Sequence, residues 1–166
     1  ITISIVYFIF GFKLPFFYCS IVILIGLVTN LYLHFKVKQN QLNNFTSTII
    51  LLFDTAQLAL LLYMTGGIKN PFIILLIVPA IVSSTFLNLR STINLSIITI
   101  SILIILMLYH QPLPHSGDLH FHVPDYYLYA IPIAVVICLV FLTYFGFRFG
   151  MESRKRTEAL NKLELI

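Results

Sequence analysis

Six apolar runs separated by short polar breaks dominate the chain. They cover residues 1–10, 15–33, 45–64, 71–87, 92–109 and 125–147. Most approach the length of about 20 residues that an α-helix needs to cross a hydrocarbon core, and the first is interpreted as the clipped end of such a helix. Backbone groups inside a bilayer must bond within their own segment, and the short alternating strands of a barrel are absent from the pattern. The sequence therefore predicts an all-α integral membrane protein, a six-helix transmembrane bundle.

The last part of the chain changes character. Residues 151–166 are rich in charged and helix-favouring side chains and contain no Gly or Pro. Leu160 and Leu163, with Leu165 or Ile166, form an apolar stripe that favours a cytoplasmic helix starting a coiled coil. A basic tail held by anionic lipid is the alternative. We therefore expect a transmembrane sensor domain over residues 1–149 and a linker helix over residues 150–166.

Basic residues lie at the ends of the apolar runs, where they orient a membrane protein. The 166 residues are 59% hydrophobic and 10% charged, with a formal net charge of +4. If the polar stretch 34–44 is cytoplasmic, eight of the 10 Lys and Arg residues share that side: Lys36, Lys38, Arg90, Arg148, Arg154, Lys155, Arg156 and Lys162. This excess predicts a cytoplasmic C-terminus and places stretch 65–72 outside. It also argues for lipid rather than nucleic acid as the partner of the positive charge.

Two polar residues interrupt the third run near its middle. Asp54 and Gln57 share a helix face with Thr65 by i, i+3 and i+4 spacing. An ionisable group at that depth is costly and is often functional. One interpretation is a face that lines a ligand cavity leading toward stretch 65–72. The other is that both side chains hydrogen-bond a neighbouring helix or a partner chain.

The polar break after the third run combines turn chemistry with features that a turn does not require. Gly66 suits the end of a helix, and Asn70 followed by Pro71 suits the start of the next one. Gly67, Lys69 and Phe72 are not explained in this way. A ring, an amide and free N–H groups at a membrane surface would suit a flat, lipid-soluble molecule that carries carbonyl groups, such as a quinone. The residues alone do not favour a quinone over a lipid headgroup.

The same stretch resembles the sensor region of the RegB/PrrB/ActS family of redox-responsive sensor histidine kinases. That family carries a GGxxNPF motif in the periplasmic loop between its third and fourth transmembrane helices. The matching positions here are Gly66, Gly67, Asn70, Pro71 and Phe72, accompanied by Asp54, Gln57, Tyr63, Pro79 and Ser83. The resemblance implies that the five motif residues bind ubiquinone as a signal, with Asp54, Gln57 and Tyr63 as possible cavity-lining residues. Phe72 is the residue expected to contact the quinone.

The resemblance also implies the context of the intact protein. It would be a homodimeric, ATP-dependent protein-histidine kinase of the bacterial inner membrane that signals to a cytoplasmic response regulator. The 166 residues contain no phosphoacceptor His-Glu box and no Gly-rich nucleotide motif, so no catalytic residue is predicted. Cys19 and Cys138 lie inside apolar runs without a CxxC spacing and are expected to be packing residues.

Two other functions remain open from the residues alone. A small carrier or channel would use Asp54 and Gln57 on a translocation path. An extracytoplasmic metal sensor would use the His-rich loop, in which His120 and His122 are weak candidates because their spacing matches no closed zinc pattern.

Overall fold

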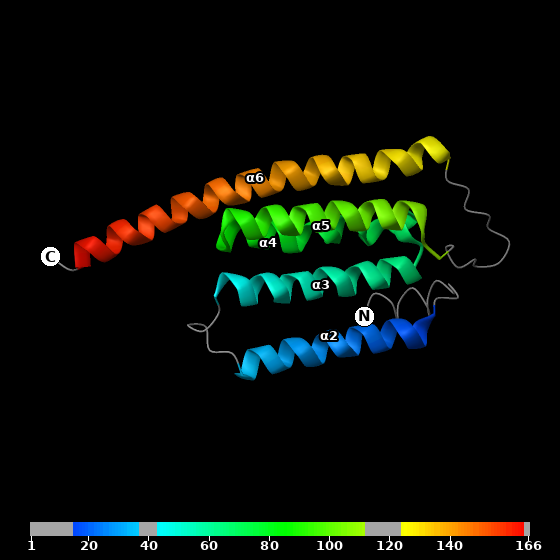
Figure 1. The fold of residues 1–166 in the computed structure, drawn as a ribbon, viewed down its shortest axis with the longest axis horizontal. Coiled ribbons are helices and arrows are strands. Elements are labelled where there is room, and N and C mark those ends of the chain that lie inside the picture. Colours follow the sequence, from blue (N-terminus) through cyan, green and yellow to red (C-terminus); the bar gives the residue numbers. More distant parts are fainter. Residues whose placement is uncertain (1–14, 37–42, 112–123, 165–166) are drawn as a thin grey trace.

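The computed structural model describes residues 15–36, 43–111 and 124–164, which are helical apart from short turns. The elements are α2 (Phe16–Lys36), α3 (Asn44–Met64), the 3₁₀ helices η2 (Gly67–Lys69) and η3 (Pro71–Ile77), α4 (Val78–Phe86), α5 (Leu89–Leu108) and α6 (Asp125–Glu164). Figure 1 shows the long helices side by side with roughly aligned axes. Four of the described helices are long and apolar enough to cross a membrane. An all-helical, multi-pass arrangement is therefore confirmed for these residues, and the predicted run 1–10 lies outside them.

The fourth predicted span is not one continuous α-helix. The structure has η3 for seven residues and then α4 for nine. Pro79 stands in the first turn of α4, and it has no N–H to donate to a carbonyl one turn earlier. The 3₁₀ helix before it rises about 2.0 Å per residue, compared with about 1.5 Å in an α-helix. The combined segment therefore reaches roughly 27 Å, close to the hydrocarbon width, with fewer residues than an α-helix needs.

The core lies where α3, η3, α5 and α6 meet. Leu62, Leu76, Leu103 and Leu139 come from these four elements, and none is more than 2% exposed. The helix α4 packs most extensively against α6. By contrast, α2 contacts only α3 among the described elements, so most of its apolar surface is left for lipid.

One 40-residue helix, α6, joins the last span to the charged tail. It is continuous across the boundary predicted between residues 149 and 150, and Pro132 lies inside it. Its residues 151–163 are exposed, and Figure 1 shows this part extending past the other helices. At helical rise α6 is about 60 Å long, roughly twice the hydrocarbon width, so its C-terminal part must leave the membrane.

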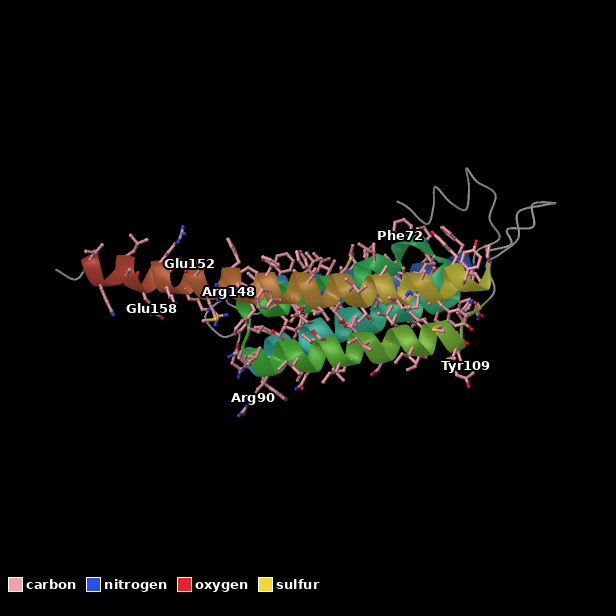
Figure 2. All side chains as sticks on the ribbon, turned by 90° about the horizontal axis from the view of Figure 1, so that it is seen from above. Phe72, Arg90, Tyr109, Arg148, Glu152 and Glu158 are labelled. Carbon is pink, nitrogen blue, oxygen red and sulfur yellow. The ribbon has the colours of Figure 1, made fainter. Side chains whose placement is uncertain are left out.

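Residues from different helices meet at each end of the bundle. Figure 2 shows Phe72 and Tyr109 at one end, and Arg90 and Arg148 toward the other. Each span of α3 to α6 crosses the bundle in the direction opposite to the previous one (Figure 1). Arg90 and Arg148, two of the eight basic residues assigned to one side of the membrane, therefore lie toward the same end of the bundle.

Candidate functional site

The break between α3 and η3 is a compact turn built on two left-handed glycines. Gly66 has φ 106° and Gly67 has φ 56°. The N–H groups of Lys69 and Asn70 donate to the carbonyls of Gly66 and Gly67, at 3.1 and 3.2 Å. Side chains with a Cβ rarely adopt these φ values. The turn therefore requires glycine at both positions, as the capping argument predicts for Gly66.

Gly67 is also required by the end of α5. A Cβ on Gly67 would overlap the His110 side chain. His110 is held there because its Nδ1 lies 2.9 Å from the carbonyl of Leu106, and the N–H of Gln111 donates to the carbonyl of Tyr63 at 3.0 Å. The close approach of α5 thus explains the second glycine, for which the capping argument has no role.

Both polar atoms of the Asn70 side chain form hydrogen bonds within the turn. Its Nδ2 donates to Oγ1 and to the carbonyl of Thr65, at 2.6 and 3.2 Å. Its Oδ1 accepts from the N–H of Phe72 at 2.9 Å, with Pro71 at the start of η3. The predicted helix cap is confirmed. The idea that the Asn70 amide donates freely to a ligand does not fit this geometry, because both of its polar atoms are already bonded.

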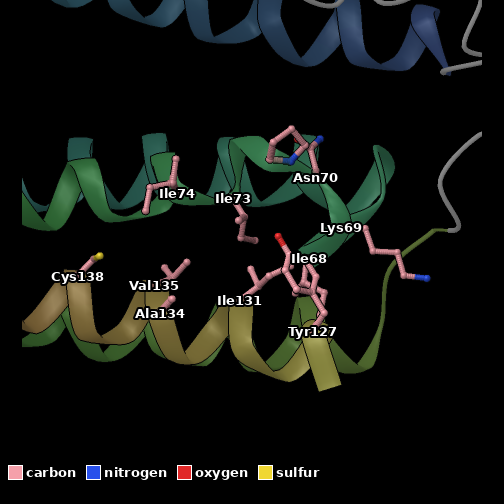
Figure 3. Close-up of a pocket in the computed structure, with 11 residues that line it drawn as sticks. Ile68, Lys69, Asn70, Ile73, Ile74, Tyr127, Ile131, Ala134, Val135 and Cys138 are labelled. Carbon is pink, nitrogen blue, oxygen red and sulfur yellow. The ribbon is translucent and has the colours of Figure 1, made fainter. Parts of the chain in front are cut away.

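A groove of about 480 Å³ runs between this turn and α6. Its wall consists of Ile68, Lys69, Asn70, Pro71, Ile73, Ile74, Tyr127, Ile131, Ala134, Val135 and Cys138 (Figure 3). The volume lies within the range of about 300–1,000 Å³ that small-molecule sites have, and the lining is mostly apolar with a few polar groups. One wall comes from η2 and η3, and the other comes from the helix that leaves the bundle.

The groove includes only part of the predicted motif site. Asn70 and Pro71 line it, whereas Gly66 and Gly67 are buried in the turn. Phe72 is 43% exposed and does not line the groove. The α6 residues of the opposite wall were not predicted, because nothing in the sequence specifies which later span packs against the turn.

The polar residues of α3 face other neighbours. Gln57 donates from Nε2 to the carbonyl of Val22 on α2 at 2.9 Å, and Gly26 leaves room for it. For Gln57, the structure has the helix-to-helix bond of the second interpretation. Asp54 is partly buried and makes no hydrogen bond or ion pair with another described residue. Asp54, Gln57 and Tyr63 do not line the groove.

The other candidate groups provide no second site among the described residues. His120 and His122 lie outside them, and no group of three metal-binding side chains occurs within ranges 15–36, 43–111 and 124–164. Cys19 is buried in α2, Cys138 lies in the groove wall, and both are free thiols.

The helices α4 and α6 approach each other closely at the end of the bundle opposite the turn. Gly146 sits against Oγ of Ser84, and Gly150 sits against the backbone of Thr85, each without room for a Cβ. Arg154 then donates to the carbonyl of Leu87 at 3.1 Å, at the end of α4. Small residues four apart allow membrane helices to approach closely. The sequence carries this signal as Gly146 and Gly150, although it does not identify the partner helix.

These features define a multi-pass helical membrane domain with a ligand-sized groove at one end and a long helix leaving at the other. The chain belongs to the family of PilS-like transmembrane domains, a six-transmembrane family whose model matches residues 9–160. It is also similar to the sensor histidine kinase RegB of Cereibacter sphaeroides, with 33% identity over 151 residues, which are 90% of this chain. This similarity confirms the resemblance predicted from the turn. The chain spans 33% of that relative's length, and no solved structure matches the chain.

Proposed function

We propose that this chain is the membrane sensor module of a two-component histidine kinase that responds to the redox state of the quinone pool. The observation that carries the proposal is the groove between the GGxxNPF turn and α6, because a molecule there touches both the motif and the exit helix. The family membership and the similarity to a sensor histidine kinase support the kinase context.

The proposed orientation puts the turn on the periplasmic face of a bacterial inner membrane and the end of α6 in the cytoplasm. It is supported by the grouping of Arg90, Arg148 and the basic tail at the end opposite Phe72 (Figure 2). The exposed stripe of Leu160 and Leu163 supports a coiled coil between two copies, which would pass the signal to a kinase core and a response regulator.

Ubiquinone and ubiquinol differ in the groups that they present to the groove. The oxidised ring has two carbonyl acceptors, whereas the reduced ring has two hydroxyl groups that also donate. A ligand shifts a conformational equilibrium only if it interacts differently with the two conformations. In this mechanism the redox change alters how firmly the bound ring holds the turn against α6. Gly66, Gly67, Asn70 and Pro71 shape the turn, and Phe72 offers an exposed ring on the same segment, outside the groove lining.

Substitution of Phe72 tests the proposal. In the intact kinase reconstituted in nanodiscs, Phe72→Ala should raise the dissociation constant for decyl-ubiquinone about three- to tenfold through loss of the ring contact. It should also weaken the response of autophosphorylation to quinone. Phe86→Ala is the control, because Phe86 is an exposed phenylalanine at the last residue of α4, far from the turn. An unmodified protein that binds no decyl-ubiquinone would contradict quinone sensing, and equal binding by Phe72→Ala would remove Phe72 from the site.

A further inference from the structure

The groove has a polar end and an apolar end. Lys69 and Tyr127 lie at the end nearest the turn, and Figure 3 shows Cys138 and Ile74 toward the other. Among the described residues, neither the Lys69 ammonium nor the Tyr127 hydroxyl has a hydrogen-bond or ion-pair partner. The Asn70 amide is fully engaged with Thr65 and Phe72. The side-chain donors without a partner at this end are therefore Tyr127 and Lys69, whose ammonium extends outward past the other lining residues (Figure 3).

The apolar part of the groove follows α6 lengthwise. Its α6 residues are Tyr127, Ile131, Ala134, Val135 and Cys138. Their spacing of three and four residues places them on one face of the helix. From the first to the last, this face extends about 16 Å at helical rise. Ala134 has the smallest side chain of this face, and it is exposed, so it leaves the groove open at its middle.

We infer that the quinone lies lengthwise on α6, with its oxygen-bearing ring at Lys69 and Tyr127 and its isoprenoid tail across Ala134. The inference rests on the proposed function and adds the ligand-contacting residues of the exit helix, which lie outside the motif. Both donors suit a carbonyl acceptor, and the apolar face beyond them suits a hydrocarbon chain. The bound ring then touches the helix that continues into the tail, so its redox state acts on α6 by direct contact.

Two pairs of matched variants test this placement. Ala134→Leu fills the middle of the groove, whereas Ala130→Leu makes the same change one turn earlier at an exposed position that does not line it. Tyr127→Phe removes only the hydroxyl, and Tyr129→Phe is its control on an exposed tyrosine outside the groove. Affinity for decyl-ubiquinone is measured with the intact protein in phosphatidylcholine nanodiscs.

We expect Ala134→Leu to raise the dissociation constant at least tenfold, because the added side chain occupies the path of the tail. Loss of one hydrogen bond in Tyr127→Phe should raise it about three- to tenfold. Neither control should change it measurably. Thermal unfolding of all four variants verifies folding, and a groove-lining variant that fails to fold is replaced by Ala134→Val or by photo-crosslinking of an azido-quinone to the unmodified protein.

The outcomes separate this inference from the proposed function. If the unmodified protein binds quinone and both groove variants bind it equally well, the ligand does not lie on α6 and only the inference fails. Crosslinking confined to peptides outside α6 would have the same meaning. If the unmodified protein binds no quinone, the proposed function fails as well.

An anionic phospholipid is the competing occupant, because its headgroup could also pair with Lys69. Quinone affinity that is independent of phosphatidylglycerol content supports the inference. Affinity that falls as phosphatidylglycerol increases, and recovers in Lys69→Gln, would assign the polar end to a lipid headgroup and overturn it.

Discussion

At the scale of single residues, the turn can be separated into what local chemistry determines and what a distant neighbour determines. The cap at Asn70 and the left-handed Gly66 follow from rules that involve a few adjacent positions, and the sequence predicts both. Gly67 depends on His110, which lies more than forty positions away and reaches the turn only through the packing of α5. No local rule contains that contact, so its reason appears only in the folded chain.

Replacement of Asn70 tests whether this residue shapes the turn or binds the proposed quinone ligand. Asn70→Ala removes the bonds to Thr65 and Phe72 and should destabilise the protein by about 1–2 kcal/mol. Asn88→Ala is the control, because Asn88 caps α5 by accepting from the N–H of Ser91 at 2.8 Å, away from the groove. Denaturant titration should give a similar loss for both variants, and only Asn70→Ala should also weaken quinone binding.

A different pattern of affinities would assign another role to Asn70. Unchanged stability with weaker quinone binding would mean that its amide contacts the quinone directly. Loss of quinone affinity in both variants would mean that affinity follows global stability rather than the shape of the turn.

At the scale of elements, hydrophobic length predicts the spans but not their internal geometry. The runs at 15–33, 45–64 and 92–109 correspond to α2, α3 and α5 with small shifts at the ends. The run at 71–87 has the composition of a continuous helix, yet its first part is the 3₁₀ helix η3. Amino-acid composition does not distinguish a 3₁₀ helix from an α-helix here, because either helix would bury the same apolar side chains. Pro79 is the one local signal of the change.

The contact between α4 and α6 offers an element-scale prediction from two glycines one turn apart. Ala favours a helix over Gly by about 1 kcal/mol. At position 150 the Cβ of an alanine would meet the backbone of Thr85, which cannot rotate away. At position 146 the Cβ would meet the hydroxyl of Ser84, which can rotate away. Overpacking of this kind costs about 1–3 kcal/mol. Gly150→Ala should therefore be destabilising in an unfolding titration in mixed micelles, and Gly146→Ala should be close to neutral.

Equal effects of the two substitutions would argue against this close backbone contact. A side chain larger than Ala at position 150 extends the series, since Gly150→Leu must push α4 and α6 apart. We expect it to lose more stability than Gly150→Ala.

At the scale of the whole molecule, one continuous segment touches α6 near both ends of the bundle. Residues 67–77 form one wall of the groove and contact α6 at one end of the bundle. At the other end α4 packs against α6, and the carbonyls of Thr85 and Leu87 accept from Arg154. The sequence indicates that the last span leads to the tail. It does not indicate that the segment after the turn is the main partner of that span, because apolar faces of similar composition could pair in several ways. The structure supplies this pairing.

The whole-molecule prediction concerns transmission from the groove to the tail. Arg154 joins α6 to the end of α4 through the carbonyls of Thr85 and Leu87, at 3.4 and 3.1 Å. The positive charge of Arg154 also interacts favourably with the partial negative charge at the C-terminus of α4. If movement of the groove wall reaches the tail through α4, Arg154→Ala in the intact protein should reduce the proposed effect of quinone on autophosphorylation and leave the dissociation constant for quinone nearly unchanged. Arg156→Ala is the matched control, because Arg156 pairs at 3.4 Å with Glu152 on α6 itself. A full quinone response in Arg154→Ala would show that the signal passes along α6 without the α4 contact, and an equal loss in both variants would assign the effect to the charge of the tail.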